Sequence, residues 1–368
     1  MRGKVTFLLV SLALTCACSK PPPPGTTNDL SDLPRFELIT VISAQLLQVG
    51  PKNEVLTNNS GPSTSYQAIV SPIDIREYLR PVSQPKMFQD QLHVDNKGEQ
   101  VGQNMFLDES GKLQPYLQTG IVAEFVDGEK VGLRPLRIPS SKYRYFVGRQ
   151  GIYAGNRASG KIEKIFDNQN ITSVSGRNDL LFTAIDSPLG YSEVFRFGVG
   201  IKPKSIHQGV LCRIANIGLN GSVTIQDAQD FICVDSAGRA QSIPNANFEV
   251  AEFQYRGKSW FVGFRRIMSS DNKVLNSYPA IWNSKGETIP LIKLCPELDG
   301  KIIRLQNMHI AKIMTNSNGL IAFEMSGSNP NPEYNIGGPN PGGMSDRNYS
   351  WQTYVIKAVG ATPKVLAP

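Results

Sequence analysis

Short apolar stretches alternate with polar turns along most of the chain after residue 35. The stretches are rich in β-branched and aromatic residues, and the turns between them contain glycine, asparagine or aspartate. This pattern is typical of strands joined by tight turns. No amphipathic helical pattern longer than about two turns interrupts the series. The pattern therefore predicts an all-β protein.

The predicted strands recur in similar units. Six segments share an apolar or aromatic strand, a turn that ends in glycine, and an aliphatic residue shortly afterwards. The turn glycines are Gly111, Gly160, Gly200, Gly238, Gly286 and Gly360. Because glycine adopts positive φ at little cost, each of these turns is expected to close a hairpin.

A second hairpin turn is predicted ahead of most of these glycines. The turns are Asn96-Lys97-Gly98, Asn178-Asp179, Asn220-Gly221, Arg256-Gly257 and Asn318-Gly319. Two hairpins make four strands, and a four-stranded unit every roughly 40–50 residues is the size of a β-propeller blade. Residues 35–368 are therefore predicted to form a β-propeller of six or seven four-stranded blades. A pair of double-sheet sandwiches with similar turn spacing is the alternative.

The segment Ile281–Leu291 has the form apolar-Trp-x-x-x-Gly-x-x-x-x-Leu. This form resembles the extracellular repeats of the HAF type found in bacterial surface proteins, and the resemblance spans most of residues 95–366. It implies an extracellular repeat domain.

The start of the predicted domain is less regular. Residues 36–49 (FELITVISAQLLQV) are apolar enough for one long strand or a short helix. They are expected to complete a blade with the C-terminal strand Val355–Leu366, or residues 35–95 supply a seventh blade.

The N-terminus has a positive start, Arg2 and Lys4, and then an apolar run from Val5 to Ala17. A run of roughly 13 residues matches a signal-peptide core and is shorter than the about 20 residues of a membrane-spanning helix. The following motif, Leu14-Thr15-Cys16-Ala17-Cys18, resembles the bacterial lipoprotein signal. The resemblance implies that residues 1–17 are removed and that Cys18 is acylated, since a thiolate is the nucleophile that takes up the lipid.

Two alternatives to lipidation are a plain signal peptide cut near Ala17 and a Cys-x-Cys metal pair. Ser19 follows Cys18, and the absence of aspartate there favours the outer membrane by the same resemblance. Pro21–Pro24 favour an extended polyproline helix. Residues 18–34 are thus predicted to be a lipidated cysteine and a semi-rigid linker, so that one partner of the protein is the membrane of the cell envelope.

Composition limits the partners of the folded part. The formal net charge is +7, but the lysines and arginines are scattered, which excludes the basic block of a nucleic-acid groove. The cysteines beyond the signal are Cys212, Cys233 and Cys295, an odd number without a disulfide framework. Cys212 and Cys233 are expected two strands apart, about 9–10 Å, which exceeds disulfide reach, so both are predicted to be reduced core residues.

Binding is predicted on one face of the propeller. In a four-stranded blade, the connection between the second and third strands lies on the same face as the links between blades, and these connections vary most in length here. Insertions on one face of a repeat protein are a common place for binding. The candidate binding residues are Arg265, Arg266 and Asp271 in the insertion 264–278, and Glu333, Tyr334, Asp346, Arg347 and Tyr349 in the insertion 326–350.

The sequence contains no catalytic motif that is complete. His93, His207 and His309 stand in no metal-ligand spacing, and neither a Gly-x-Ser-x-Gly elbow nor a phosphate-binding glycine loop occurs. No catalytic residue, metal or cofactor is therefore predicted. Glycoside hydrolysis needs two carboxylates that can be distant in sequence, and the candidates near predicted strand ends are Asp186, Asp227, Asp230 and Glu324.

These observations favour a non-enzymatic lipoprotein of the bacterial cell envelope, with a propeller that binds a protein or polysaccharide partner through its variable face. The alternative is an envelope carbohydrate hydrolase or lyase with carboxylates at the mouth of the propeller.

Overall fold

The computed structural model describes residues 33–360 apart from 43–44, 61–64, 71–92, 95–99, 102–104, 109, 112, 116–121, 127–128, 178, 219, 229, 272–273, 303–306 and 329–348. The chain divides into two compact units, residues 1–33 and 34–368. The expected signal peptide, Cys18 and the linker prolines lie outside the described residues. Within the described part, no helix is long and apolar enough to cross a membrane.

Antiparallel β-sheet makes up nearly all of the described secondary structure, which confirms the predicted all-β class. Three four-stranded sheets follow one another in chain order. The first contains β14 (Ile171–Arg177), β15 (Leu180–Asp186), β16 (Ser192–Gly198) and β17 (Ile201–Gly209). The second contains β18 (Arg213–Ile217), β19 (Val223–Asp227), β20 (Asp230–Val234) and β21 (Ala240–Ile243). The third contains β22 (Ala246–Tyr255), β23 (Lys258–Met268), β24 (Val274–Trp282) and β25 (Thr288–Pro290).

A fourth four-stranded sheet joins the two ends of the domain. It contains β26 (Asn307–Thr315), β27 (Leu320–Ser328), β28 (Tyr349–Ala358) and, as its outer strand, β1 (Phe36–Ile42). β1 pairs antiparallel with β28, from Phe36 opposite Ala358 to Ile42 opposite Thr353. The expected pairing of the N-terminal segment with the C-terminal strand is thus confirmed.

The sequence suggested a single element for residues 36–49, but the structure divides them between two strands. β1 ends at Ile42, and β2 (Gln45–Val49) begins another sheet with β3 (Val55–Ser60) and β4 (Ser65–Val70). Two short ribbons follow, β5 (His93–Val94) with β6 (Gln100–Val101) and β7 (Met105–Leu107) with β8 (Leu113–Pro115).

The remaining sheet has five strands, one more than the predicted blade. It contains β9 (Val122–Val126), β10 (Glu129–Pro135), β11 (Tyr143–Gly148), β12 (Gly151–Asn156) and β13 (Ile162–Asp167). Two 3-10 helices, η2 (Leu291–Lys293) and η3 (Pro296–Leu298), lie between β25 and β26.

The turn glycines have the backbone conformation that the sequence predicts. Each of the six has a positive φ between 73° and 87°, where a side chain would be strained. Asp179, Gly221, Gly257 and Gly319 also have positive φ at the first hairpin turns. Positive φ at the predicted turns is therefore confirmed wherever the structure describes them. The hairpin expected at Gly360 is not confirmed, because residues 361–368 lie outside the described residues and β1 is the strand that pairs with the outer edge of β28.

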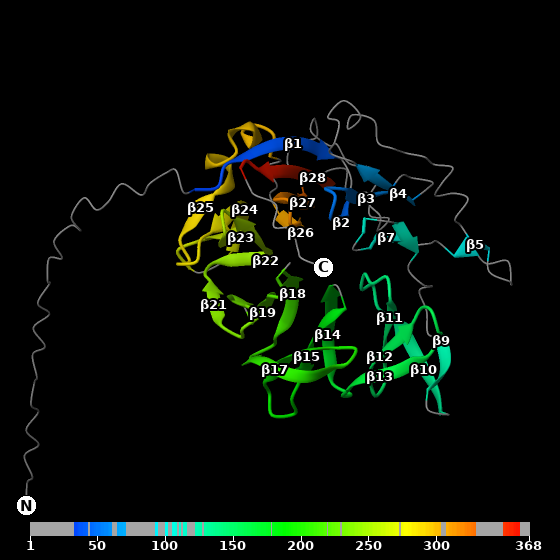
Figure 1. Ribbon diagram of the computed structural model, residues 1–368. Coiled ribbons are helices and arrows are strands. Elements are labelled where there is room, and N and C mark those ends of the chain that lie inside the picture. Colours follow the sequence, from blue (N-terminus) through cyan, green and yellow to red (C-terminus); the bar gives the residue numbers. More distant parts are fainter. Residues whose placement is uncertain are drawn as a thin grey trace, which may run out of the picture. The chain divides into compact units, whose positions relative to one another are not determined.

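Consecutive sheets contact each other through their first strands. β14 contacts β18, β18 contacts β22, β22 contacts β26, and β26 contacts β2, so these strands lie innermost in Figure 1. The Gln48 side-chain amide exchanges two hydrogen bonds with the backbone of Leu107, which joins β2 to β7. The Arg157 guanidinium, in the turn after β12, lies over the Phe106 ring at 5.8 Å. β13 contacts β16, and Phe166 packs with Phe197 in one buried cluster. The succession of contacts thus returns to its first sheet, which is the arrangement of blades in a β-propeller.

Apolar side chains fill the space between neighbouring sheets. Phe231 and Cys233 of β20 pack with Phe261 of β23 and Trp282 of β24 in one buried cluster. Phe182 of β15 packs against Ile225 and Val234 of the next sheet in another. Cys212, Cys233 and Cys295 are buried and unpaired with one another, which confirms the prediction of reduced core cysteines.

Strand direction separates the connections into two faces. Because successive strands are antiparallel, the link between two sheets and the turn between their second and third strands lie at the same ends of the strands. We call this the link face, and its described connections include residues 187–191, 210–212, 228, 244–245 and 269–271. We call the other end the turn face, and its connections include residues 199–200, 235–239, 256–257, 283–287 and 316–319.

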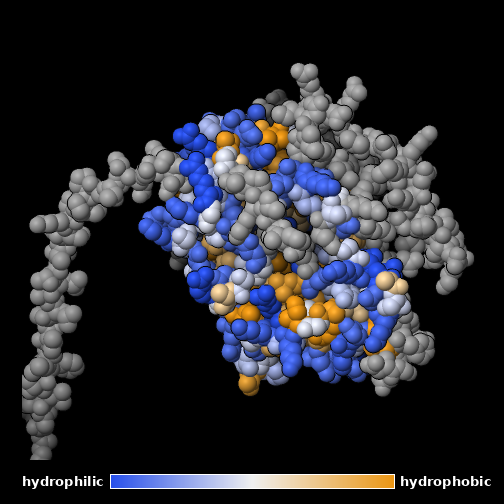
Figure 2. Space-filling model, in the orientation of Figure 1, coloured by the Kyte–Doolittle hydropathy of each residue, from blue (hydrophilic) through white to orange (hydrophobic). Residues whose placement is uncertain are grey.

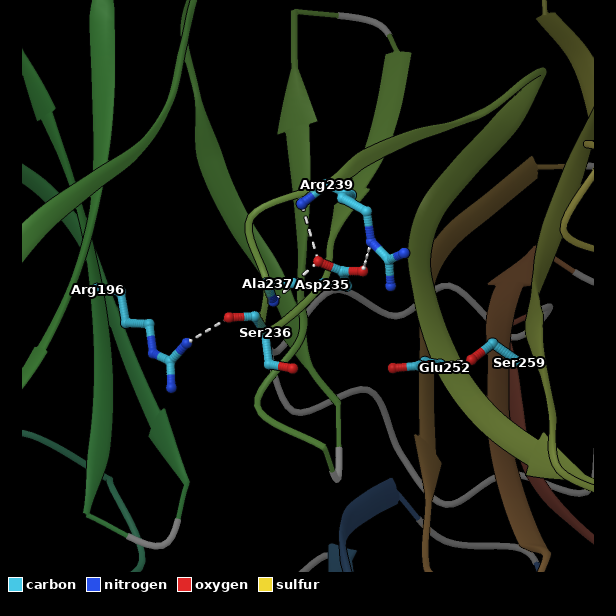
Figure 3. Close-up of polar contacts among 7 residues, drawn as sticks. All are labelled: Arg196, Asp235, Ser236, Ala237, Arg239, Glu252 and Ser259. Carbon is cyan, nitrogen blue, oxygen red and sulfur yellow. Dashed lines mark hydrogen bonds and ion pairs between the residues drawn. The ribbon is translucent and has the colours of Figure 1, made fainter.

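Figure 3 shows one polar turn of the turn face, residues 235–239. The Asp235 carboxylate accepts hydrogen bonds from the backbone amides of Ala237 and Arg239 and from the Arg239 guanidinium. These bonds, first the one from the Arg239 amide, lower the pKa of Asp235. Arg196 of β16 reaches the backbone oxygen of Ser236 at 3.0 Å and so joins two neighbouring sheets. This turn is therefore held by bonds among its own residues and by Arg196 of the neighbouring sheet.

Phe36 tests whether β1 is an integral part of the last sheet. Its ring is buried and lies edge-on to Phe253 of the neighbouring sheet, with 5.7 Å between centroids. Phe36→Ala should lower the free energy of unfolding by about 3 kcal/mol, because a large buried ring is removed. Glu37→Ala, at the exposed neighbouring position of the same strand, should have little effect. Equal denaturation midpoints for Phe36→Ala and the wild type would contradict the closure by β1.

Candidate functional site

Exposed apolar side chains gather on the link face. Of the eight large apolar side chains that are exposed among the described residues, five belong to this face: Leu189, Val210, Leu211, Ile267 and Met268. Ile201 and Val359 lie at the turn face, and Ile292 lies in η2. Figure 2 shows that hydrophobic residues form patches on an otherwise mostly hydrophilic surface. Apolar patches on a soluble surface indicate interaction sites.

Two of these side chains are very exposed and belong to adjacent sheets. Leu189, in the β15–β16 turn, is 82% exposed, and Leu211, in the β17–β18 link, is 66% exposed. Leu211 has φ +56°, the left-handed region that costs a side chain roughly 1–2 kcal/mol. This conformation points Leu211 outward while its neighbour Cys212 is buried. Strain of this kind is a reason to suspect function.

The expected insertion 264–278 is mostly strand, because β23 continues to Met268 and β24 begins at Val274. Arg265 and Arg266 therefore belong to β23 near its link-face end, and only Asp271 lies in the connection. Arg265 donates a hydrogen bond to the Tyr278 hydroxyl at 3.3 Å. Arg266 forms an ion pair with Asp230 of the neighbouring sheet, with 3.8 Å between nitrogen and oxygen, and its side chain is only 10% exposed. Asp271 is exposed and accepts a hydrogen bond from the Ser269 hydroxyl. Arg266 therefore joins two sheets, which the sequence pattern did not reveal.

The other predicted binding residues are beyond structural description. Glu333, Tyr334, Asp346 and Arg347 lie outside the described residues. Tyr349 is the first residue of β28, opposite Ser328 of β27.

Each of the four candidate carboxylates contacts a polar or charged group other than a second candidate carboxylate. Asp186 accepts a hydrogen bond from the Ser192 hydroxyl at 2.6 Å. Asp227 lies 3.0 Å from His207. Glu324 is buried and accepts the Leu46 amide at 2.8 Å. Asp230 is held by Arg266, as described above, so no two of these four form a facing acid pair within the described contacts.

A charged cluster that the sequence did not predict lies between β2, β22, β26 and β27. The Lys312 ammonium donates hydrogen bonds to the backbone oxygens of Leu46 and Leu47, both at 3.2 Å. The Glu249 carboxylate accepts the Ile313 amide at 3.0 Å. Lys312 interacts electrostatically with both Glu249 and Glu324. The signal for this cluster was a charged residue within an apolar strand, as in NMHIAKIMT (Asn307–Thr315) and ANFEVAEFQY (Ala246–Tyr255).

Burial controls the protonation of this cluster. Burial and, to a smaller extent, the Glu324 charge raise the pKa of Glu249 to about 7, although the Ile313 amide and Lys312 lower it. Burial also raises the pKa of Glu324 and lowers the pKa of Lys312. Glu249 is thus a carboxyl group that changes charge near neutral pH. A group of this kind is a candidate general acid or base.

A second cluster that sequence spacing did not show lies on the link face. His207 of β17, Cys212 of the β17–β18 link and Asp227 of β19 offer a nitrogen, a sulfur and an oxygen within 4.8 Å of one another. Of these three residues, the sequence had marked only Asp227, as a candidate carboxylate at a strand end. The link between two sheets brings the three side chains together.

Comparison with known proteins adds little to this geometry. No protein-family model and no curated protein matches the sequence. Among solved structures, the chain is similar to the tricorn protease, with a TM-score of 0.37, 10% identity, and coverage of 77% of this chain and 28% of that one. It is also similar to dipeptidyl peptidase 4 of Porphyromonas gingivalis, with a TM-score of 0.41, 9% identity, and coverage of 79% and 58%.

A third similar structure is the β-propeller domain of the Trilobed protease from Pyrococcus furiosus, with a TM-score of 0.33, 10% identity, and coverage of 77% of this chain and 79% of that one. The chain spans less than two thirds of the first two structures. The assignment of the fold rests on the strand pairing within this chain.

The raised pKa of Glu249 should make the free energy of unfolding depend on pH. A carboxyl group with an unfolded pKa near 4.5 and a folded pKa of about 7 binds a proton more tightly when the protein is folded. Its stabilising contribution is therefore complete below about pH 4.5 and is lost as the pH rises through about 7. Between these limits the stability of Glu249→Gln relative to the wild type should rise by about 3 kcal/mol.

Chemical denaturation at several pH values measures this difference. Glu37→Gln, at an exposed position, is the control and should follow the wild type at every pH. Parallel curves for Glu249→Gln and the wild type would show that Glu249 is ionised throughout and would contradict its buried state.

Proposed function

We propose that the protein is a lipoprotein of the bacterial cell envelope whose β-propeller binds a protein partner through the link face. The observation that supports this proposal best is the concentration of exposed apolar side chains on that face, five of the eight found among the described residues. The turn face, with its short turns, serves as the rigid opposite end of the scaffold.

The chemistry of the link face favours a protein over a polysaccharide. Its exposed apolar side chains are aliphatic, and aliphatic area is stabilised by burial against another apolar surface. Protein interfaces have an apolar centre within a polar rim. Arg265 and Asp271 supply polar groups near Ile267 and Met268 in the chain, which suits such a rim.

The lipid anchor is supported by the sequence pattern at residues 14–18. Each buried methylene contributes about 0.8 kcal/mol to membrane binding, so a cysteine that carries several acyl chains anchors firmly where a single chain does not. Cys18 is the proposed attachment point, and residues 19–34 hold the propeller away from the outer membrane.

We also propose seven blades. The described residues supply four four-stranded sheets, the β2–β4 sheet and the five-stranded β9–β13 sheet. The β7–β8 ribbon has its own contacts on both sides, through Gln48 to β2 and through Phe106 to Arg157. These contacts favour a separate blade at β7–β8 over an extension of either neighbour.

The alternative function, a carbohydrate hydrolase or lyase, has one observation in its favour. Glu249 titrates near neutrality beside a second carboxyl group, Glu324. Both groups accept backbone amides, and the nearby ammonium of Lys312 donates to backbone oxygens. Such bonds suit a structural role, so the binding function is preferred.

Substitution on opposite faces tests the binding function. The combined variant Leu189→Ser, Ile267→Ser and Met268→Ser removes exposed apolar area from the link face. The matched control, Ile201→Ser and Val359→Ser, removes similar side chains from the turn face. In affinity capture from detergent-solubilised envelopes, the wild type and the control should retain the same protein partner, and the link-face variant should lose at least tenfold of it. Equal capture by all three proteins, or loss with the control alone, would overturn the assignment.

Labelling with a fatty-acid analogue tests the anchor separately. Cys18→Ala should abolish incorporation of the label and release the protein from the membrane fraction, because the acylated thiol is missing. Cys16→Ala changes the neighbouring cysteine and should leave labelling intact. Labelling that persists in Cys18→Ala would disprove the proposed attachment point.

A further inference from the structure

We propose that His207, Cys212 and Asp227 bind a zinc-class divalent cation on the link face. The three ligand atoms lie within 4.8 Å of one another, and the His207 Nε2 and Asp227 Oδ2 atoms are 3.0 Å apart. Bond lengths of about 2.0–2.1 Å to nitrogen or oxygen and about 2.3 Å to sulfur imply separations of roughly 3.3–3.6 Å around a tetrahedral zinc ion. The sulfur therefore has to approach by roughly 1.3 Å at most, while the His207–Asp227 pair widens slightly.

The ligand types identify the class of metal. Imidazole, thiolate and carboxylate together suit a borderline-soft ion such as Zn²⁺, whereas Mg²⁺ and Ca²⁺ prefer oxygen ligands alone. Three protein ligands leave a fourth position for water or for another donor. The Cys212 thiol lies 4.0 Å from the backbone oxygen of Ser192, whose hydroxyl donates to Asp186 at 2.6 Å, so Asp186 is a further carboxylate in this region.

The local backbone is arranged around the Asp227 carboxylate. Its second oxygen accepts the Val210 amide at 2.7 Å, which orients the carboxylate towards the link. A Cβ atom at Gly209 would lie only 2.0 Å from the Asp227 carboxylate, so a side chain there would displace that group. Leu211 adopts its left-handed conformation immediately before Cys212. These features hold the buried Cys212 side chain close to His207 and Asp227.

The cluster joins one buried ligand to two that solvent reaches. Cys212 is only 1% exposed. His207 and Asp227 keep 15% and 20% of their side chains exposed, which leaves access from solvent.

A bound ion would connect two blades. His207 lies on the outer strand of one sheet, whereas Asp227 belongs to the second strand of the next. The ion would therefore hold the strained 210–212 link, and with it the exposed side chains of Val210 and Leu211, in one conformation. The inference does not depend on the identity of the protein partner.

Cobalt titration of the full-length protein, purified in detergent with any affinity tag removed, tests the site. Co²⁺ alone is the probe, because a thiolate ligand produces a charge-transfer absorption in the near ultraviolet. One equivalent should bind with this absorption, and Zn²⁺ should displace it. Cys212→Ala should abolish the band. Cys233→Ala, which removes another buried core thiol, should retain it.

A second pair of variants keeps the test decisive if Cys212→Ala fails to fold. His207→Gln and Asp227→Asn alter partly exposed side chains and should each weaken Co²⁺ binding at least tenfold, while Glu193→Gln in the neighbouring β16 should not. A wild-type protein without the thiolate band, or a band that survives in both Cys212→Ala and His207→Gln, would overturn the proposal.

Discussion

Each sheet of this protein has two faces that must be covered, and this constraint determines the rest of the structure. The buried clusters combine residues of consecutive sheets, such as Phe231 with Phe261 and Phe182 with Ile225. Burial of such rings contributes several kcal/mol each. A sheet at the end of such a series would leave one face exposed. The contacts that return to the first sheet, together with β1 in the last sheet, meet this requirement.

The same topology places the short turns on the turn face and the links between sheets on the link face. First strands that run in the same direction place every link between sheets at one end, and hairpin turns with positive-φ glycine close the other end. On the turn face, side chains such as Asp235 satisfy the turn itself. On the link face, the chain crosses between sheets, so it brings together groups from different blades, as Arg266 with Asp230 and His207 with Asp227. Binding chemistry is therefore expected at that end.

The strand pattern was readable from the sequence because its signals are local. Glycine at Gly200, Gly238 and Gly286 marks turns whose backbone excludes most other residues. The pairing of the N-terminal strand with the C-terminal one was also predicted, since an open last blade needs an outer strand. The division of residues 36–49 into two strands was missed, because both halves are equally apolar.

The candidate site was less predictable, since its contacts join distant residues. Lys312 and Leu46 are separated by 266 positions, and no local pattern indicates that contact. His207 and Asp227 are only 20 positions apart, but their approach depends on the path of the link between two sheets. Charged residues within apolar strands, such as Glu249 and Lys312, were the one available signal. The sequence therefore shows where strands and turns lie, whereas side-chain partnerships across blades require the structure.

We propose that the link face, not the turn face, contacts the protein partner in the cell envelope. A photo-crosslinking amino acid placed at Leu189 or at Ile201 in the living cell compares two exposed positions on opposite faces. The account predicts a crosslinked protein adduct from position 189 and none from position 201. An adduct from position 201 alone, or equal adducts from both positions, would contradict it.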